Sequence, residues 1–409
     1  MKYENKDEKV FMKSSKRTYL TAVFFSLVMF TRAMGFLPYV PNIIIYICLG
    51  LSFLYGLSNK VSSDKLFIAL LAYIPVEILL ASPPSLFRSY PRFILFALLC
   101  FAIGPVFQSV KIRKWRENLL DSSLWICTLL AVGSFVCYFL GINYMRVNDE
   151  FLEIQSGTFG GLTNQSMVLG PIAGMAAIFM GYKAYLTKNK YYLIAVVVCM
   201  GAVLFSASRS SLVCSVTGLV MMLFKMTGGK SKFIRILTIV VMLAALTFPL
   251  WEGATDFVMQ KQMNNLEIGG YAASRSGKWL NRWIEFKSSP IWGIGFDAID
   301  LNFFSDYSRE KGQIEPGTSW MAIPSMLGLI GVLIMAPFFY RCFVACYKGD
   351  DSKNALRLGL FILFCIHMLA EGYIFSAGGF LCFILWLTLA NCYDQKYTNF
   401  DNSVSNKGV

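Results

Sequence analysis

The sequence predicts an all-α, polytopic membrane protein of about twelve transmembrane helices, with one large extracytoplasmic loop that contains a short amphipathic helix. Three observations carry this prediction. Hydrophobic residues make up 56% of the 409 residues, and the mean hydropathy is +0.55. Only 15% of the residues are charged, whereas a soluble chain carries about 25%. Apolar runs long enough to cross a bilayer recur, and basic residues gather in every second turn between them.

The apolar runs justify the helices in order along the chain. They lie near residues 19–37, 40–57, 66–81, 93–110, 120–142, 166–182, 191–206, 211–224, 234–250, 320–340, 356–374 and 377–393. Several runs are short or contain one charge, so eleven or thirteen spans also fit. We therefore expect residues 1–409 to form a single integral membrane domain, with 251–319 as the large loop inserted between two transmembrane helices.

The basic turns predict the orientation of these helices. Lys and Arg accumulate in the N-terminal segment, in the cluster 111–116 and between residues 341 and 357. Cytoplasmic turns carry this excess, so both termini are expected on the cytoplasmic side. The first apolar run is interrupted by Arg32 and lacks a small-residue cleavage site, which favours a retained helix over a signal peptide. The net charge of +13 follows from this orientation, and no nucleic-acid partner is needed to explain it.

The cysteines predict neither disulfides nor a metal site. All eleven fall within predicted helices or at their cytoplasmic ends, and none lies in the long loop. Cys342 and Cys346 have the spacing of ligands on one helical turn, but no histidine or second cysteine pair accompanies them. We expect no metal and no cofactor.

Arginine, rather than lysine, dominates the outward side. The arginines in question are Arg32, Arg88, Arg92, Arg146, Arg209, Arg275, Arg282 and Arg309. A guanidinium is always charged and pairs with phosphate through two donors. This pattern indicates a surface that binds an anionic, phosphorylated ligand, although interfacial anchoring would also use such residues.

The long loop contains one predicted helix, at residues 274–289, with Ser274 as its N-cap and Pro290 at its end. One face of this helix carries Arg275, Lys278 and Arg282 with Glu285 beside them, and the adjoining stripe carries Trp279, Leu280, Trp283 and Ile284. We expect it to lie on the membrane with its aromatic side down and its cations toward a pocket. A purely structural surface helix is the alternative.

Four ionisable residues fall inside predicted spans: Arg32, Glu77, His367 and Glu371. Such residues are costly in a bilayer and are candidates for function. With the predicted topology they lie toward the outward side, as does Arg209 at the start of its helix. Structural explanations remain open, since Glu77 could pair with Arg32 and His367 could bond a neighbouring carbonyl. Glu371 needs a partner, which His367 or an arginine could supply.

Several of these motifs resemble those of the O-antigen polymerase and ligase superfamily of bacterial surface-polysaccharide assembly (Wzy-type proteins). The family has a Ser-Arg turn leading into a helix, matched at 205–212. Its loop has an arginine and then a tryptophan four residues on, matched by Arg275 and Trp279, before a Pro-x-x-Gly-x-Gly ending, matched at 290–295. A Gly-x-x-Gly helix follows, matched by Gly328 and Gly331. The resemblance covers about residues 160–390.

One departure bears on function. Many family members, including the ligases, carry a His-Asn pair eleven residues before the Gly-x-x-Gly, where this chain has Gly317 and Thr318. The missing histidine puts a ligase role in doubt and favours a polymerase. A lipid-linked oligosaccharide flippase or transporter is a further alternative, which would predict two related halves and discontinuous helices at matched positions.

The resemblance implies a polysaccharide polymerase of the bacterial cytoplasmic (inner) membrane, making O-antigen, capsule or exopolysaccharide. Its substrate would be an oligosaccharide repeat unit on undecaprenyl diphosphate, and a chain-length regulator and a flippase of the same pathway would be its partners. Arg209 and Arg275 are expected to stabilise the departing diphosphate, supported by Arg282 and Lys278. Glu371 is the expected base, with His367 orienting it or taking that role. The expected substrate-binding residues are Arg282, Lys278, Arg32, Glu77, Arg88 and Trp279.

Overall fold

The structure is a computed structural model, and it describes residues 15–38, 40–57, 62–80, 89–145, 159–228, 273–300, 317–349 and 352–405, with four isolated positions between 231 and 238. Most of the predicted span at 234–250 and most of the long loop lie outside these residues. So do Arg88, Arg146 and Arg309.

The described residues are almost entirely helical. The helices are α2 (Ser15–Phe30), α3 (Asn42–Leu57), α4 (Lys65–Leu80), α5 (Ser89–Ala102), α6 (Val110–Phe139), α8 (Ser166–Thr187), α9 (Lys190–Phe205), α10 (Arg209–Thr227), α13 (Ala273–Ser288), α14 (Ser319–Lys348), α15 (Ser352–Ala370) and α16 (Phe380–Ser405). Two short strands, β1 (Ser62–Ser63) and β2 (Phe107–Gln108), pair antiparallel. Eleven of the predicted apolar runs overlap helices, although the runs 19–37 and 93–110 extend past the ends of α2 and α5, and the overlap confirms the mostly helical fold.

Five of these helices are long and apolar enough to cross a membrane: α6, α8, α10, α14 and α15. Shorter apolar helices occupy Asn42–Gly56, Ser89–Ala102, Lys190–Phe205 and Phe380–Asp394. Long side chains such as Leu79, Leu129 and Leu333 are exposed on the outside of the helices, as expected where lipid replaces water. The structure therefore supports a helical membrane protein.

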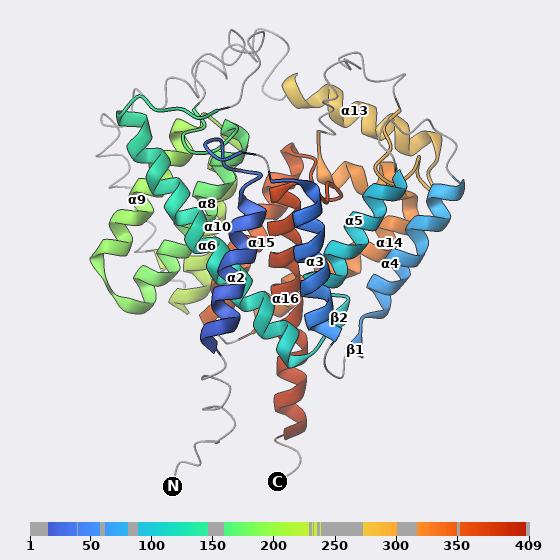
Figure 1. Cartoon of the computed structure of the whole chain (residues 1–409), viewed down its shortest axis with the longest axis horizontal. Helices are drawn as coiled ribbons and strands as arrows, with labels where there is room; N and C mark the ends of the chain where they lie inside the picture. Colours follow the sequence, from blue (N-terminus) through green and yellow to red (C-terminus); the bar gives the residue numbers. More distant parts are fainter. Residues whose placement is uncertain are drawn as a thin grey trace.

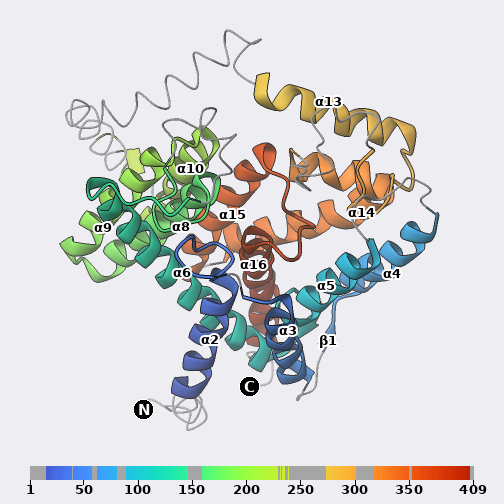
Figure 2. The same ribbon diagram turned by 45° about the horizontal axis from the view of Figure 1, so that its top comes forward.

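The helices form a bundle with two distinct ends. In Figure 1 the start of α2 and the end of α16 lie together at the bottom, and α13 lies across the top. Figure 2 keeps α13 above α14, away from the start of α2. The predicted loop helix is confirmed as α13, although Ser274 lies inside it rather than before it.

Small residues bring α10 and α15 into close contact. A Cβ atom built on Gly218 would lie 2.7 Å from the carbonyl oxygen of Gly359, and one built on Gly359 would lie 2.9 Å from that of Gly218. Gly174 of α8 approaches Ser215 of α10 in the same way. Glycines that permit such approach are typical of helix packing in membranes. This contact fixes the first residue of α10 near the last turn of α15.

Helix α14 is broken at Gly328, which has φ 62° and ψ −164°. The segment after α13 fills the break, because the Leu329 N–H donates to the Pro290 carbonyl (2.8 Å) and the Ile294 N–H donates to the Ser325 carbonyl (2.8 Å). A Cβ on Gly328 would lie 2.2 Å from the Ile291 carbonyl oxygen. The two glycine motifs singled out in the sequence are therefore two sides of one contact. It satisfies backbone groups that a broken helix would otherwise leave unpaired.

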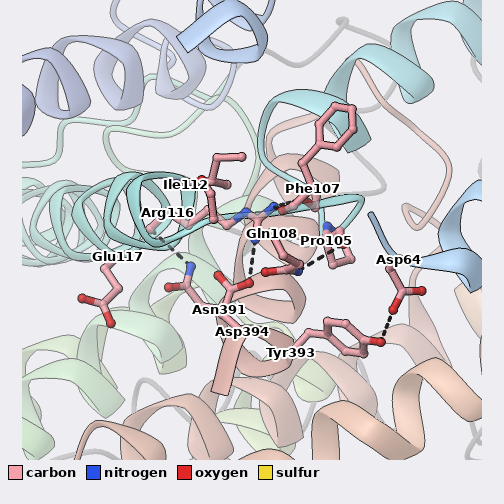
Figure 3. A network of polar contacts seen from close by, with 12 residues as sticks. Asp64, Pro105, Phe107, Gln108, Ile112, Arg116, Glu117, Asn391, Tyr393 and Asp394 are labelled. Atoms are coloured by element: carbon pink, nitrogen blue, oxygen red, sulfur yellow. Dashed lines mark hydrogen bonds and ion pairs between the residues drawn. The ribbon is translucent and has the colours of Figure 1, made fainter. Parts of the chain in front are cut away.

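A network of buried polar contacts joins the first part of α6 to α16 (Figure 3). Arg116 of α6 pairs with Asp394 of α16 at 2.6 Å, with both side chains almost fully buried. Arg116 also donates to the carbonyls of Gly104 and Phe107, and Tyr393 donates to Asp64. By its position in the basic cluster 111–116, Arg116 is expected only to orient the helices in the membrane. The structure shows instead that it ties α6 to α16.

Candidate functional site

An ion pair joins α13 to the end of α15. Nη2 of Arg275 lies 2.5 Å from Oε1 of Glu371, with the side chains 20% and 12% exposed. The sequence left the partner of Glu371 open between His367 and an arginine, and the partner is Arg275. This pair lies at the α13 end of the bundle, opposite the start of α2 (Figure 1).

The position of Glu371 is fixed by the start of α14. The last carbonyls of any helix lack partners within the helix. Here the Thr318 hydroxyl donates to the carbonyl of Met368 (3.0 Å), and both the amide and the hydroxyl of Ser319 donate to the carbonyl of Glu371 (2.9 and 2.7 Å). The Ser319 hydroxyl also accepts the Tyr373 N–H (2.9 Å). One serine therefore holds the whole turn that carries Glu371.

His367 lies one helical turn below Glu371, and its Nδ1 is 3.1 Å from the Tyr373 hydroxyl. Both side chains are buried. The partner of His367 Nδ1 is therefore a side chain, whereas the alternative for His367 was a bond to a neighbouring carbonyl. Tyr373 was missed in the sequence because it follows the helix, where periodicity gives no indication of its direction.

Arg209 adds a second guanidinium to the same region. It is the first residue of α10, whose N-cap Ser208 accepts the N–H of Ser211 through its hydroxyl. Arg209 and Arg275 lie close enough for their charges to repel each other, and the charge of Arg275 also acts on His367. The first residue of α10 therefore lies within electrostatic range of the Arg275–Glu371 pair of α13 and α15.

Lys278 and Trp279 hold α13 over this region. A Cβ atom built on Gly317, where φ is +82°, would lie 2.5 Å from Cβ of Lys278. The indole N–H of Trp279 donates to the carbonyl of Leu369 at 3.1 Å. Gly317 is therefore needed for the lysine to lie flat against the start of α14.

Arg282 does not face this site. Its side chain is fully buried and donates to Oε2 of Glu285 (2.9 Å) and to the hydroxyl of Ser325 (3.0 Å). Burial lowers the pKa of Arg282 and raises the pKa of Glu285, because both lose water. Expected to bind substrate, Arg282 instead fixes α13 to α14.

Glu77 and Arg32 have separate partners, so the alternative of an Arg32–Glu77 pair is wrong. Glu77 Oε2 accepts the N–H of Phe296 at 2.7 Å, whereas Arg32 donates to Asn42. The loop after α13 packs against α4 at Glu77, so a loop amide and not Arg32 meets the carboxylate. Glu77 is fully buried, so it holds this loop.

Arg92 of α5 forms an ion pair with Asp297 of this loop. Asp297 has a φ of 57°, a conformation in which aspartate is enriched among non-glycine residues. Burial raises the pKa of Asp297, against the lowering effect of Arg92. A partner for Arg92 could not be predicted, because Arg92 and Asp297 are far apart along the chain.

Together these contacts define the class of protein: a helical membrane protein with a partly exposed, charged site at one end. Arg209, Arg275, His367 and Glu371 are brought together with Tyr373, while Arg282, Glu77 and Arg32 lie in structural contacts. The guanidinium pair can bind an anion and the carboxylate can accept a proton. No protein-family model and no curated protein matches the chain.

Proposed function

We propose that the protein is a polysaccharide polymerase that transfers a growing glycan from undecaprenyl diphosphate onto the next lipid-linked repeat unit. The reaction would take place at the outer face of the bacterial cytoplasmic membrane. The proposal includes a topology of about twelve spans, cytoplasmic termini and an extracytoplasmic loop at 251–319. The observation that carries it is the Arg275–Glu371 pair with Arg209 beside it.

The two arginines suit a diphosphate leaving group. Two neighbouring guanidiniums repel each other, and a dianion bound between them removes that repulsion. As the bond to the sugar breaks, negative charge grows on the diphosphate oxygen. Fixed cations then stabilise the transition state more than the ground state.

Glu371 suits the role of base. The acceptor hydroxyl attacks the anomeric carbon of the donor sugar, the bond from that carbon to the diphosphate oxygen breaks, and undecaprenyl diphosphate leaves with the electron pair. The hydroxyl proton passes to Glu371. Binding of the diphosphate to Arg275 would loosen its bond to Glu371 and free the carboxylate to accept that proton. The contact between His367 and Tyr373 helps to hold the turn that carries Glu371.

The distribution of charge favours this function over a flippase or transporter. A transporter concentrates polar groups near the midplane of the membrane. In the described residues the ion pairs lie toward two ends, with Arg275–Glu371 at the α13 end and Arg116–Asp394 at the other. A ligase remains disfavoured, because Gly317 and Thr318 stand where ligases carry a histidine and an asparagine.

The test is complementation of a deletion strain with Arg209→Ala and with Arg275→Ala, followed by gel analysis of surface glycan. We expect a single repeat unit in place of a ladder, at unchanged protein level. Arg17→Ala is the matched control, because Arg17 is exposed at the start of α2, and it should keep the ladder. A full ladder in both test variants would refute the proposal.

A further inference from the structure

Helix α13 has three different sides. The inner side carries Arg275, Lys278, Arg282 and Glu285, which contact the rest of the protein as described above. A second side exposes large apolar side chains: Trp279, Leu280 and Trp283. The third side carries the small or polar residues Gly277, Asn281 and Ser288, with the half-buried Ile284 at its edge toward Leu280. An ordinary surface helix has one buried and one polar side, so the extra apolar side needs an explanation.

The apolar side is large and continues beyond the helix. Trp283 is 43% exposed and Leu280 57%. Ile291 and Trp292, just after the helix, are also about half exposed. The ring of Trp292 stacks on Tyr73 of α4, with centroids 6.3 Å apart. We name Trp279, Leu280, Trp283, Ile291 and Trp292 the aromatic ridge.

The ridge joins the apolar exterior of the bundle. Beyond Tyr73, α4 exposes Val76, Leu79 and Leu80, side chains that suit contact with lipid. The Trp292 segment also packs against the break in α14. The aromatic ridge therefore extends from the exposed apolar side chains of α4 to those of α13.

Charge at the ridge fits a lipid headgroup. Nζ of Lys287 lies 5.5 Å from the centre of the Trp283 ring, and Lys287 is exposed. Tryptophan is enriched at the level of lipid headgroups, where its ring is half in the apolar phase. A lysine above such a ring can reach the phosphates while its stem stays among apolar groups.

We propose that the aromatic ridge docks on the phospholipid bilayer at the α13 end of the protein, so that α13 lies in the membrane interface with its polar side toward water. This role is independent of the proposed catalysis. It predicts that the charged site beside Arg275 opens at headgroup level rather than high above the membrane.

The experiment uses full-length protein in nanodiscs made with ordinary or brominated phosphatidylcholine, because bromine on the acyl chains quenches nearby indoles. Trp283→Phe should remove a part of the emission that bromolipid quenches. Trp386→Phe is the control, because Trp386 is fully buried and bonds the carbonyl of Ile374. Its removal should take away emission that bromolipid leaves unchanged.

A tryptophan introduced on the opposite side of α13 tests whether that side faces water. In the Trp283→Phe background, Ser288→Trp places an indole on the polar side of α13. That indole should respond to iodide in water and not to bromolipid. If Trp283 itself is quenched by iodide and not by bromolipid, the ridge faces water, and a protein partner would be its occupant instead. Since the nanodiscs contain no other membrane protein, bromolipid quenching of Trp283 would assign the contact to lipid.

Discussion

Arg275 and Glu371, 96 residues apart in the chain, meet at 2.5 Å where α13 crosses the end of α15. The pair places a guanidinium directly against the carboxylate that follows the last turn of α15. The pair is also partly exposed, so a ligand can compete for the arginine. It is therefore both a structural contact and the centre of the proposed site.

Replacing Glu371 by Gln should abolish most polymerisation without unfolding the protein. Glutamine keeps the shape of the side chain and can accept a bond from Arg275, but it is a very poor base at neutral pH. Loss of a general base typically costs about 10²–10⁴-fold in rate. The measurement is the initial rate of polymer formation by purified protein with lipid-linked repeat units.

The control for this prediction is Glu117→Gln. Glu117 forms an ion pair with Arg357 at 2.9 Å, so this variant also changes a glutamate that pairs with an arginine, but away from the proposed site. The Glu117→Gln variant should retain the wild-type rate. Equal rates in Glu371→Gln and in wild type would rule out Glu371 as the base.

Gly293→Ala should destabilise the loop after α13. Gly293 has a φ of +86°, and a Cβ there would lie 2.2 Å from the carbonyl oxygen of Met326. The backbone conformation alone costs alanine about 1–2 kcal/mol, and the clash adds to this. Thermal unfolding in detergent should show a lower Tm.

Gly277→Ala is the matched comparison for Gly293→Ala. Gly277 is inside α13, and nothing lies within 4 Å of a Cβ built on it. Alanine should stabilise a helix there by about 0.5–1 kcal/mol. A Tm for Gly293→Ala at or above that of Gly277→Ala would contradict the close packing of the loop against α14.

The Arg116–Asp394 pair, shown in Figure 3, should contribute much of the stability of the contact between α6 and α16. Asp394→Asn leaves a buried guanidinium without its counter-charge. Breaking a buried pair from one side costs about 3–5 kcal/mol. We expect a lower Tm and a lower protein level, whereas Lys114→Ala, which removes an exposed partner of Glu117, should change neither. An unchanged Tm in Asp394→Asn would show that the pair adds no net stability.

The pH dependence of stability tests the burial of Glu285. Burial raises the pKa of Glu285 above its ordinary value of 4.5. The folded protein therefore binds this proton more tightly than the unfolded chain does. Stability from this group is fully present below the unfolded pKa and is lost as the pH rises through the folded pKa. Wild type should thus gain Tm relative to Glu285→Gln between pH 7 and pH 5. A relative loss over the same range would mean that the carboxylate is better stabilised when folded than when unfolded.

Much of the architecture could be predicted because it depends on local physics. A helix that crosses a bilayer must be apolar over its length, so the runs at 166–182 and 356–374 predicted α8 and α15. The spacing of Arg275, Lys278 and Arg282 predicted an amphipathic helix, and α13 has it. The roles of these cations were not predictable, since Arg282 and Arg275 lie on the same side of α13 and meet different neighbours.

The sequence by itself determined a bundle of apolar helices, a cationic loop helix and the set of ionisable residues from which a site could be built. Only the tertiary structure decided which of these residues meet. It paired Glu371 with Arg275 and Glu77 with the Phe296 amide, and it buried Arg282. The physical reason is that periodicity fixes the side of a helix on which a residue lies, whereas its partner depends on how the break at Gly328 and the Gly218–Gly359 contact set neighbouring helices against one another.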